Sequence, residues 1–205
     1  MLKALKWVVF LLSLMPFLAL SFGAVRNTLG PDPADVLVIQ TGLWALRFLL
    51  MSLAITPLRS ISGWTWVVPY RRTFGLFSLY YACWHLIAYL LFFLQLRWSE
   101  LYEDIVERPY ITVGFTALLI LIALGATSNK RMIRRLGRRW KKLHRLVYIA
   151  SVLALLHLFW ILRTDLAEAV FYGSILVPLL AYRLYQFLVT KTAKVGRAAR
   201  PGELS

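Results

Sequence analysis

The strongest constraint on the fold is a series of six long apolar stretches separated by short polar connectors. The stretches are residues 7–24, 36–57, 73–94, 111–126, 143–162 and 167–189. A helix needs about 20 mostly apolar residues to cross the hydrocarbon core of a bilayer, and inside lipid it must satisfy its own backbone hydrogen bonds. The pattern therefore predicts an all-α membrane protein, with six transmembrane helices bundled as one domain over residues 1–205.

The composition argues against a soluble domain. Hydrophobic residues make up 60% of the 205 residues and charged residues only 16%, whereas soluble domains have about 25% charged residues. The single cysteine, Cys83, rules out an intramolecular disulfide. The first stretch follows Lys3 and Lys6 and ends at Ala24, a pattern that a signal peptide also shows. Cleavage of this stretch would leave the other five spans unchanged.

The connectors alternate in charge along the chain. Residues 127–142 contain only basic charges, whereas residues 95–110 contain Glu100, Glu103, Asp104 and Glu107 against two arginines. Because Lys and Arg concentrate in cytoplasmic loops, the alternation predicts that both termini lie in the cytoplasm. We expect a multi-pass protein of a bacterial inner membrane. The net charge of +15 then reflects topology and contact with lipid headgroups, and no nucleic-acid partner is expected.

The basic connector also contains apolar residues at helical spacing, namely Met132, Ile133, Leu136 and Trp140. This spacing predicts one short helix in the plane of the membrane interface. In one interpretation, its cations only orient the protein in the membrane. In the other, they also form a docking face for a soluble donor or for an anionic cofactor such as a flavin phosphate. We recognise no internal repeat in the sequence.

All three histidines lie in or at the edge of predicted spans, where ionisable side chains are costly and usually functional. An interhelical hydrogen bond is the alternative explanation. His85 lies 12 residues after Thr73 and His157 lies 14 after Leu143, which correspond to depths of about 18 and 21 Å. Both spans run from cytoplasm to periplasm, so the two imidazoles can face each other. Two imidazoles are one way to supply both axial ligands of a haem iron.

Small residues flank this predicted pair at helical spacing: Ser78, Ala82 and Ala88 near His85, and Ala150 and Ala154 near His157. They would leave a slot for a macrocycle, although they equally favour close packing of helices. Within the second stretch, Arg47 would need a propionate, a backbone carbonyl or the interface as its partner. We therefore predict a b-type haem with His85 and His157 as the ligands of its iron.

His144 lies at the cytoplasmic edge, 13 residues before His157. The third stretch has Arg71 and Arg72 at the matching depth, so no second histidine pair is evident. His144 is a candidate cofactor-binding residue with several possible roles. It could ligate a second haem with an unusual partner, bind a haem propionate, or contact a flavin or quinone.

Three segments resemble the MsrQ (earlier YedZ) family, within the wider ferric reductase and NADPH oxidase transmembrane group. They are RRTFGLFSLYYACWHLIAYLL at 71–91, RPYITVGFTALLILIALGATS at 108–128 and RWKKLHRLVYIASVLALLHLFW at 139–160. The resemblance implies haem b and FMN as cofactors, with His85, His144 and His157 at the family's histidine positions. It also implies that electrons pass from the quinone pool, or from a cytosolic flavin reductase, to a periplasmic molybdopterin methionine sulfoxide reductase (MsrP-like) that repairs oxidised proteins.

The expected protein is thus an electron-transfer subunit of an oxidoreductase system and not a complete enzyme alone. One alternative is a stand-alone ferric or cupric reductase of the same architecture, which the absence of a fused dehydrogenase domain disfavours. A second alternative is a transporter whose histidines relay protons. Paired histidines at equal depth without an intramembrane Asp or Glu favour haem over this relay.

Overall fold

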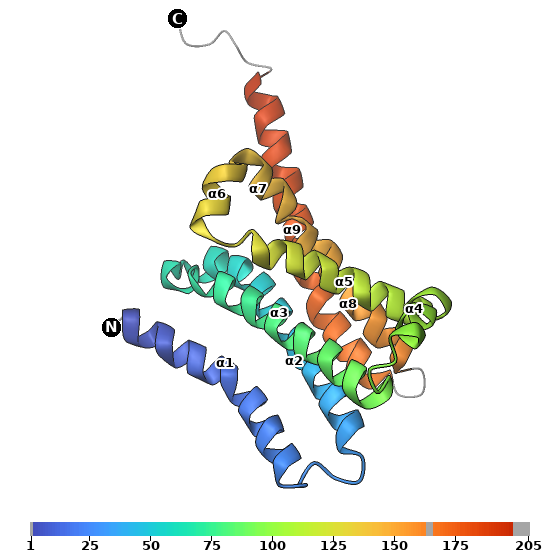
Figure 1. The fold of residues 1–205 in the computed structure, drawn as a ribbon. Helices are drawn as coiled ribbons and strands as arrows, with labels where there is room; N and C mark the ends of the chain where they lie inside the picture. Colours follow the sequence, from blue (N-terminus) through green and yellow to red (C-terminus); the bar gives the residue numbers. More distant parts are fainter. Residues whose placement is uncertain (1, 163–165, 199–205) are drawn as a thin grey trace, which may run out of the picture.

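The computed structural model describes residues 2–162 and 166–198, and every regular element in these residues is a helix (Figure 1). Six of its helical segments are long and apolar enough to cross a membrane. They are Ala4–Val25, Pro33–Ser62, Thr65–Phe93, Pro109–Ala126, Arg138–Ile161 and Ala167–Thr190. The prediction of an all-α protein with six spans is confirmed, whereas the cytoplasmic location of the termini and the single-domain organisation stay predictions.

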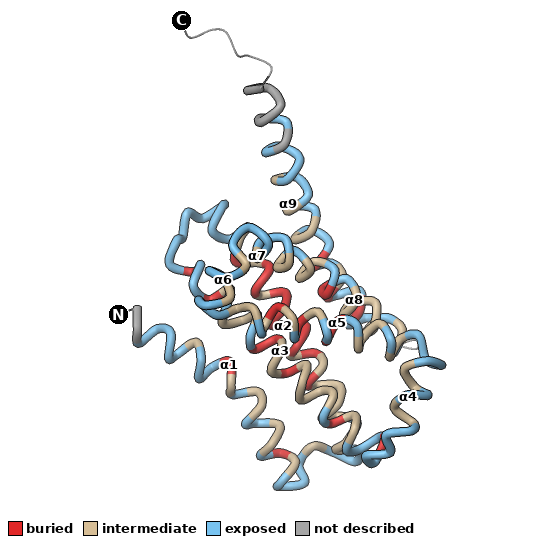
Figure 2. Tube along the Cα trace, turned by 45° about the horizontal axis from the view of Figure 1, so that its top comes forward, coloured by how far each residue is buried: buried red, intermediate tan, exposed pale blue. Residues whose placement is uncertain are grey.

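Two closely packed helix pairs form the centre of the molecule. Helix α2 (Pro33–Ser62) packs against α3 (Tyr70–Ala88), and α5 (Pro109–Ala126) packs against α8 (Leu146–Ile161). The two pairs contact each other through α3 with α5 and α2 with α8. The buried residues concentrate where these four helices meet (Figure 2). This four-helix centre positions the histidines.

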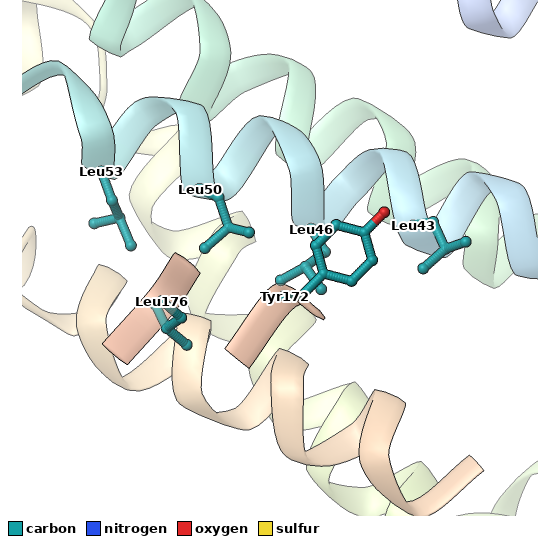
Figure 3. Packing of buried hydrophobic residues seen from close by; sticks show 6 residues of the cluster. All are labelled: Leu43, Leu46, Leu50, Leu53, Tyr172 and Leu176. Carbon is teal, nitrogen blue, oxygen red and sulfur yellow. The ribbon is translucent and has the colours of Figure 1, made fainter. Parts of the chain in front are cut away.

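Helix α9 (Ala167–Ala198) covers one side of this centre and continues beyond it (Figure 1). Four leucines of α2, at intervals of three or four residues, face Tyr172 and Leu176 of α9 (Figure 3). These leucines are Leu43, Leu46, Leu50 and Leu53. The 3.6-residue period of a helix places such residues on one face, and this face anchors α9 against α2.

Helix α1 (Leu2–Val25) lies at the edge of the bundle (Figure 1). Tyr81 of α3 links α1 to the bundle. The Tyr81 hydroxyl accepts a hydrogen bond from Phe17 N at 2.9 Å and donates one to Ser13 O at 2.9 Å. Pro16 stands between these residues, and proline within a helix disturbs the backbone hydrogen bonds around it. The fully buried Tyr81 therefore satisfies backbone groups at the proline and holds α1 in place.

The short elements lie at opposite ends of the bundle (Figure 1). At one end, α3 continues through a π-helical turn, η2 (Tyr89–Phe93), and leads to the acidic α4 (Trp98–Glu107). At the other end, α2 is followed by η1 (Thr65–Val67), and the basic connector forms α6 (Lys130–Leu136) and α7 (Arg138–Leu143).

The prediction of a single helix in the basic connector is therefore wrong, because Gly137, with a φ of 51°, separates α6 from α7. A positive φ of this kind suits glycine, which has no Cβ to clash. After the break, the Trp140 indole Nε1 donates to Thr127 O at 2.9 Å. The Trp140 ring therefore faces the bundle.

Candidate functional site

The structure brings His85 of α3 and His157 of α8 together. Their ring centroids are 6.0 Å apart and the ring planes are nearly perpendicular, at 85°. The two residues come from different helix pairs, so the packing of the pairs creates the contact. The role of either histidine as a metal ligand stays a prediction at this point.

A backbone carbonyl fixes each imidazole. His85 Nδ1 lies 2.8 Å from Val38 O of α2, and His157 Nδ1 lies 2.6 Å from Tyr110 O of α5. A carbonyl oxygen only accepts, so each Nδ1 carries the proton and donates. Each neutral ring then presents Nε2 with a free lone pair. Metal-binding histidines typically show this arrangement, since the second hydrogen bond sets tautomer and orientation.

A glycine lies against each imidazole. A Cβ added to Gly42 of α2 would lie 3.0 Å from His85 Nδ1, and one added to Gly114 of α5 would lie 2.6 Å from His157 Nδ1. Contacts below 3.0 Å force a shift of the atoms involved. The observed placement of the His157 ring therefore requires glycine at 114, whereas a Cβ at position 42 would need the His85 ring to move by only a few tenths of an ångström. The sequence did not predict either contact.

Each histidine with its carbonyl and its glycine forms one half-site: His85, Val38 and Gly42 form the first, and His157, Tyr110 and Gly114 form the second. The two half-sites are separated by a fixed number of residues along the chain. His85 and His157 are 72 residues apart, as are Gly42 and Gly114. Both histidines bond to a carbonyl 47 residues earlier. The pattern Gly-x-x-Ala-Leu-x-x-Leu occurs at 42–49 and again at 114–121. The expectation of no internal repeat is therefore wrong, and this shared pattern was the signal in the sequence that could have revealed it.

The histidine pair fits a haem better than a free metal ion. Within residues 2–162 and 166–198, no group of three or more His, Cys, Asp or Glu could hold a metal ion. A haem supplies four equatorial nitrogens itself and needs only axial ligands from the protein. Two metal–imidazole bonds of about 2 Å, plus the distances from nitrogen to ring centre, give a centroid separation of about 6 Å. The observed 6.0 Å agrees with this value.

The small residues beside the pair differ in burial. Ser78 and Ala150 are fully buried and Ala88 is nearly so, which means that protein atoms cover them, as in close helix packing, whereas Ala82 and Ala154 are only partly buried. Ser78 precedes His85 by seven residues and Ala150 precedes His157 by seven, so they are counterparts in the repeat. The Ser78 hydroxyl has no hydrogen-bond partner within the described part of the chain.

His144 is not part of the pair and lies at the end of the bundle formed by α6 and α7. Its ring stacks on Trp140 with 3.9 Å between centroids. Its Nδ1 lies 3.3 Å from Trp140 O, and its Nε2 lies 3.4 Å from Ser128 Oγ. His144 lines a cavity of about 510 Å³ together with Arg71 and Arg72, as expected from their common depth. The position 72 residues before His144 is Arg72, so the repeat does not supply a second histidine pair.

Arg47 has a partner that the sequence did not predict. Its Nε donates to Tyr172 Oη at 2.7 Å, and its guanidinium carbon lies 4.7 Å from the centre of the Trp44 ring. An arginine at membrane depth needs such partners. These contacts help to join α2 to α9.

Comparison with known proteins finds a matching family model and several similar curated proteins. Residues 41–155 match the family model described as ferric reductase like transmembrane component. A relative from Xanthomonas oryzae pv. oryzae (strain MAFF 311018) is 44% identical over 175 residues, which is 85% of this chain and 80% of the relative. A relative from Herminiimonas arsenicoxydans is 41% identical over 187 residues, covering 90% and 86% of the two chains. Both are named protein-methionine-sulfoxide reductase heme-binding subunit MsrQ.

The chain belongs to the MsrQ family. The stretch that matches the ferric reductase model contains His85 and His144 and ends two residues before His157. The family, together with the six spans, also establishes a multi-pass membrane protein.

Proposed function

We propose that this protein is a haem b membrane subunit that passes electrons across the bacterial inner membrane to a periplasmic methionine sulfoxide reductase. The observation that carries the proposal is the facing pair of His85 and His157, each with Nδ1 on a backbone carbonyl. The name that curated relatives share, heme-binding subunit of protein-methionine-sulfoxide reductase, supports the same conclusion.

The residues of this chain would hold the cofactor in a defined orientation. His85 and His157 would hold the haem iron through Nε2, while Val38 O and Tyr110 O accept from Nδ1 and so fix the tautomer and the rotation of each imidazole. Haem, when bound, supplies a one-electron couple. The surrounding apolar helices exclude water, which favours a low-dielectric site and tunes the potential.

Electrons would reach the site from the cytoplasmic side. The donor would be the quinone pool or a cytosolic flavin reductase, and the basic end formed by α6 and α7 is the side that faces it. FMN is a further cofactor suggested by the family resemblance, and His144 in the basic cavity would contact the donor-side molecule. The acceptor would be an MsrP-like molybdopterin subunit on the opposite side, where α4 lies.

Two other functions would use the same architecture. A stand-alone ferric reductase would differ only in its acceptor. A proton relay through the histidines is disfavoured, because His85 and His157 each use one nitrogen for a backbone carbonyl that cannot accept or release a proton.

The test is a set of reduced-minus-oxidised spectra and pyridine haemochrome counts on the protein purified in mild detergent. We expect a b-type spectrum that His85→Ala and His157→Ala each abolish, whereas His144→Ala, the matched control outside the pair, retains the haem of that pair. The count in His144→Ala also reports whether a second haem exists. A wild type that stays colourless after haem supplementation would refute the proposal.

The donor and acceptor are tested on the same preparation. Haem reduction is followed after adding a quinol, or NADH with a flavin reductase, and haem reoxidation after adding the periplasmic partner with methionine sulfoxide. Reoxidation that needs both partner and sulfoxide supports the proposed path. Reoxidation by ferric chelates alone, with none by the partner, would favour the stand-alone reductase.

A further inference from the structure

Helix α4 presents a stripe of large apolar side chains on the side that points away from the bundle. Trp98, Tyr102 and Val106 follow one another at intervals of four residues and are 64%, 73% and 63% exposed. Glu103 and Glu107 are exposed as well. At 3.6 residues per turn, these two glutamates lie directly beside the apolar stripe. We refer to these five residues as the outward face of α4.

The other side of α4 is fixed to the bundle. Leu101 and Ile105 are half-buried there. The Tyr89 hydroxyl of η2 donates to the Asp104 carboxylate, and Arg108 Nε donates to Asp104 Oδ1 at 3.0 Å. Tyr89 ends the span before α4 and Arg108 precedes the span after it, so Asp104 links α4 to both spans that it connects.

The turn into α4 has an unusual backbone conformation. Gln95 and Leu96 have positive φ values of 50° and 61°, which are costly for residues that carry a Cβ. Such a conformation persists only where the surrounding structure holds it. Here Leu96 N donates to Leu90 O at 2.9 Å, and Arg97 Nε donates to Leu94 O at 3.2 Å. The fold therefore imposes the direction of α4.

The segments that hold α4 also lead directly to the histidine pair. Tyr89 follows His85 by four residues, which is about 6 Å along a helix axis. Tyr110, two residues after Arg108, supplies the carbonyl that fixes His157. A protein bound to the outward face would therefore lie at the end of the bundle nearer the pair, whereas α6 and α7 lie at the opposite end (Figure 1).

The charge of the outward face favours a protein partner over lipid. The arginines that flank α4, Arg97 and Arg108, are paired with other carboxylates. Among the residues that the structure describes, Glu103 and Glu107 have no ion-pair partner. Helices that lie in a membrane interface carry Lys and Arg on their polar face, whereas exposed acids complement a basic protein surface. Tyr and Trp are also enriched in the core of protein interfaces.

We propose that the outward face of α4 docks the electron acceptor, a soluble redox subunit that presents a basic patch around an apolar pocket. Tyr102, in the middle of the apolar stripe, enters the pocket, and Glu103 and Glu107 pair with the basic patch. The charges speed the encounter, and the buried aromatic slows dissociation. This inference rests on the proposed function, which puts the acceptor on this side of the membrane, and adds the surface and its chemistry.

The first experiment measures binding of the purified MsrP-like subunit to the haem-loaded full-length protein in nanodiscs, and then haem reoxidation by that subunit with methionine sulfoxide. We expect Tyr102→Ser to weaken binding about tenfold, as truncation of an interface aromatic predicts. Glu103→Lys combined with Glu107→Lys should slow association about tenfold at low salt, and high salt should remove the difference because it screens the charges. The haem spectrum should match the wild type in both variants.

Asp35→Lys is the matched control for the charge reversal. Asp35 is an exposed carboxylate in the first turn of α2, at the same end of the bundle but on another helix (Figure 1). This control should bind the subunit and pass electrons to it as the wild type does. An equal loss in the control, or wild-type binding and reoxidation in both α4 variants, would overturn the docking face and leave the proposed function standing.

The two proposals can also fail separately in the other direction. A wild type that binds the subunit through Tyr102 but is not reoxidised by it would refute electron transfer and support the docking face. A wild type that neither binds the subunit nor is reoxidised by it would refute both.

A second measurement tests whether the outward face lies in water before docking. A spin label is attached to Tyr102→Cys in a Cys83→Ala background, in nanodiscs of phosphatidylethanolamine and phosphatidylglycerol. We expect the label to collide with a water-soluble nickel complex, and saturating subunit to suppress these collisions. Collisions mainly with lipid-dissolved oxygen, unchanged by the subunit, would place the stripe in the bilayer and overturn the proposal.

Discussion

Gly114→Ala should weaken haem binding more than any other glycine-to-alanine substitution beside the histidine pair. The new Cβ would lie 2.6 Å from His157 Nδ1, whereas ordinary contacts begin at 3.4 Å. An ordinary contact requires the ring to move by about 0.8 Å, and a shift of that size away from Tyr110 O would lengthen the 2.6 Å hydrogen bond beyond normal length. Loss of such an outer partner typically costs 10–100-fold in metal affinity, or about 1.4–2.7 kcal/mol.

The assay is a titration of the haem-free protein with haem, followed by the Soret absorbance. Gly42→Ala should have a smaller effect, because its Cβ would lie 3.0 Å from His85 Nδ1 and the ring needs to move less. Gly173→Ala is the matched control, since its Cβ would make an ordinary contact of 3.7 Å with Leu155. Wild-type affinity in Gly114→Ala, or an equal loss in Gly173→Ala, would refute the reasoning.

Two further predictions concern the pair and the outer helix. The ferric haem should give a strongly anisotropic low-spin EPR signal, because the planes of His85 and His157 are at 85°; a signal typical of parallel imidazoles would contradict this. Tyr81→Phe should lower the stability by about 1–3 kcal/mol, since it removes the hydroxyl that bonds both Phe17 N and Ser13 O. Thermal unfolding followed by circular dichroism measures the loss, and an unchanged midpoint would show that the two backbone groups bond to each other instead.

The spans and the histidine pair could be predicted because each depends on a property that is local in the sequence. Apolar length sets the spans, and residue count along a helix sets the depth of His85 and His157. The carbonyls of Val38 and Tyr110 could not be assigned, because their role depends on which helices pack together. The glycine contacts have the same origin, although the repeated Gly-x-x-Ala-Leu-x-x-Leu pattern would have marked Gly42 and Gly114 as equivalent.

The boundaries of helices explain the other differences. The predicted third span begins at residue 73, but α3 begins at Tyr70, so Arg71 and Arg72 belong to the first turn of the helix and line the cavity. The basic connector reads as one amphipathic helix by its spacing, yet Gly137 adopts a positive φ and divides it. Spacing alone does not show where a chain turns, and here the turn directs Trp140 toward His144.

A substitution at Ser78 tests whether its hydroxyl bonds to the cofactor, because the repeat places an alanine at the equivalent position. Ser78 and its counterpart Ala150 are both fully buried, and the Ser78 hydroxyl has no partner within the described part of the chain. Because alanine already fills the equivalent position, Ser78→Ala should fit without strain. It removes a buried polar group that lacks a hydrogen bond, so the haem-free protein should keep its stability or gain about 1 kcal/mol.

We expect haem affinity to stay unchanged in Ser78→Ala, because the Ser78 hydroxyl does not contact the carbonyls and glycines that position the two imidazoles. The measurement combines thermal unfolding of the haem-free protein with the Soret titration. Ser151→Ala serves as the control, since Ser151 is equally buried but donates to Tyr148 O at 2.8 Å. A tenfold loss of haem affinity in Ser78→Ala alone would mean that the hydroxyl bonds to the cofactor, and that the two half-sites hold the cofactor unequally.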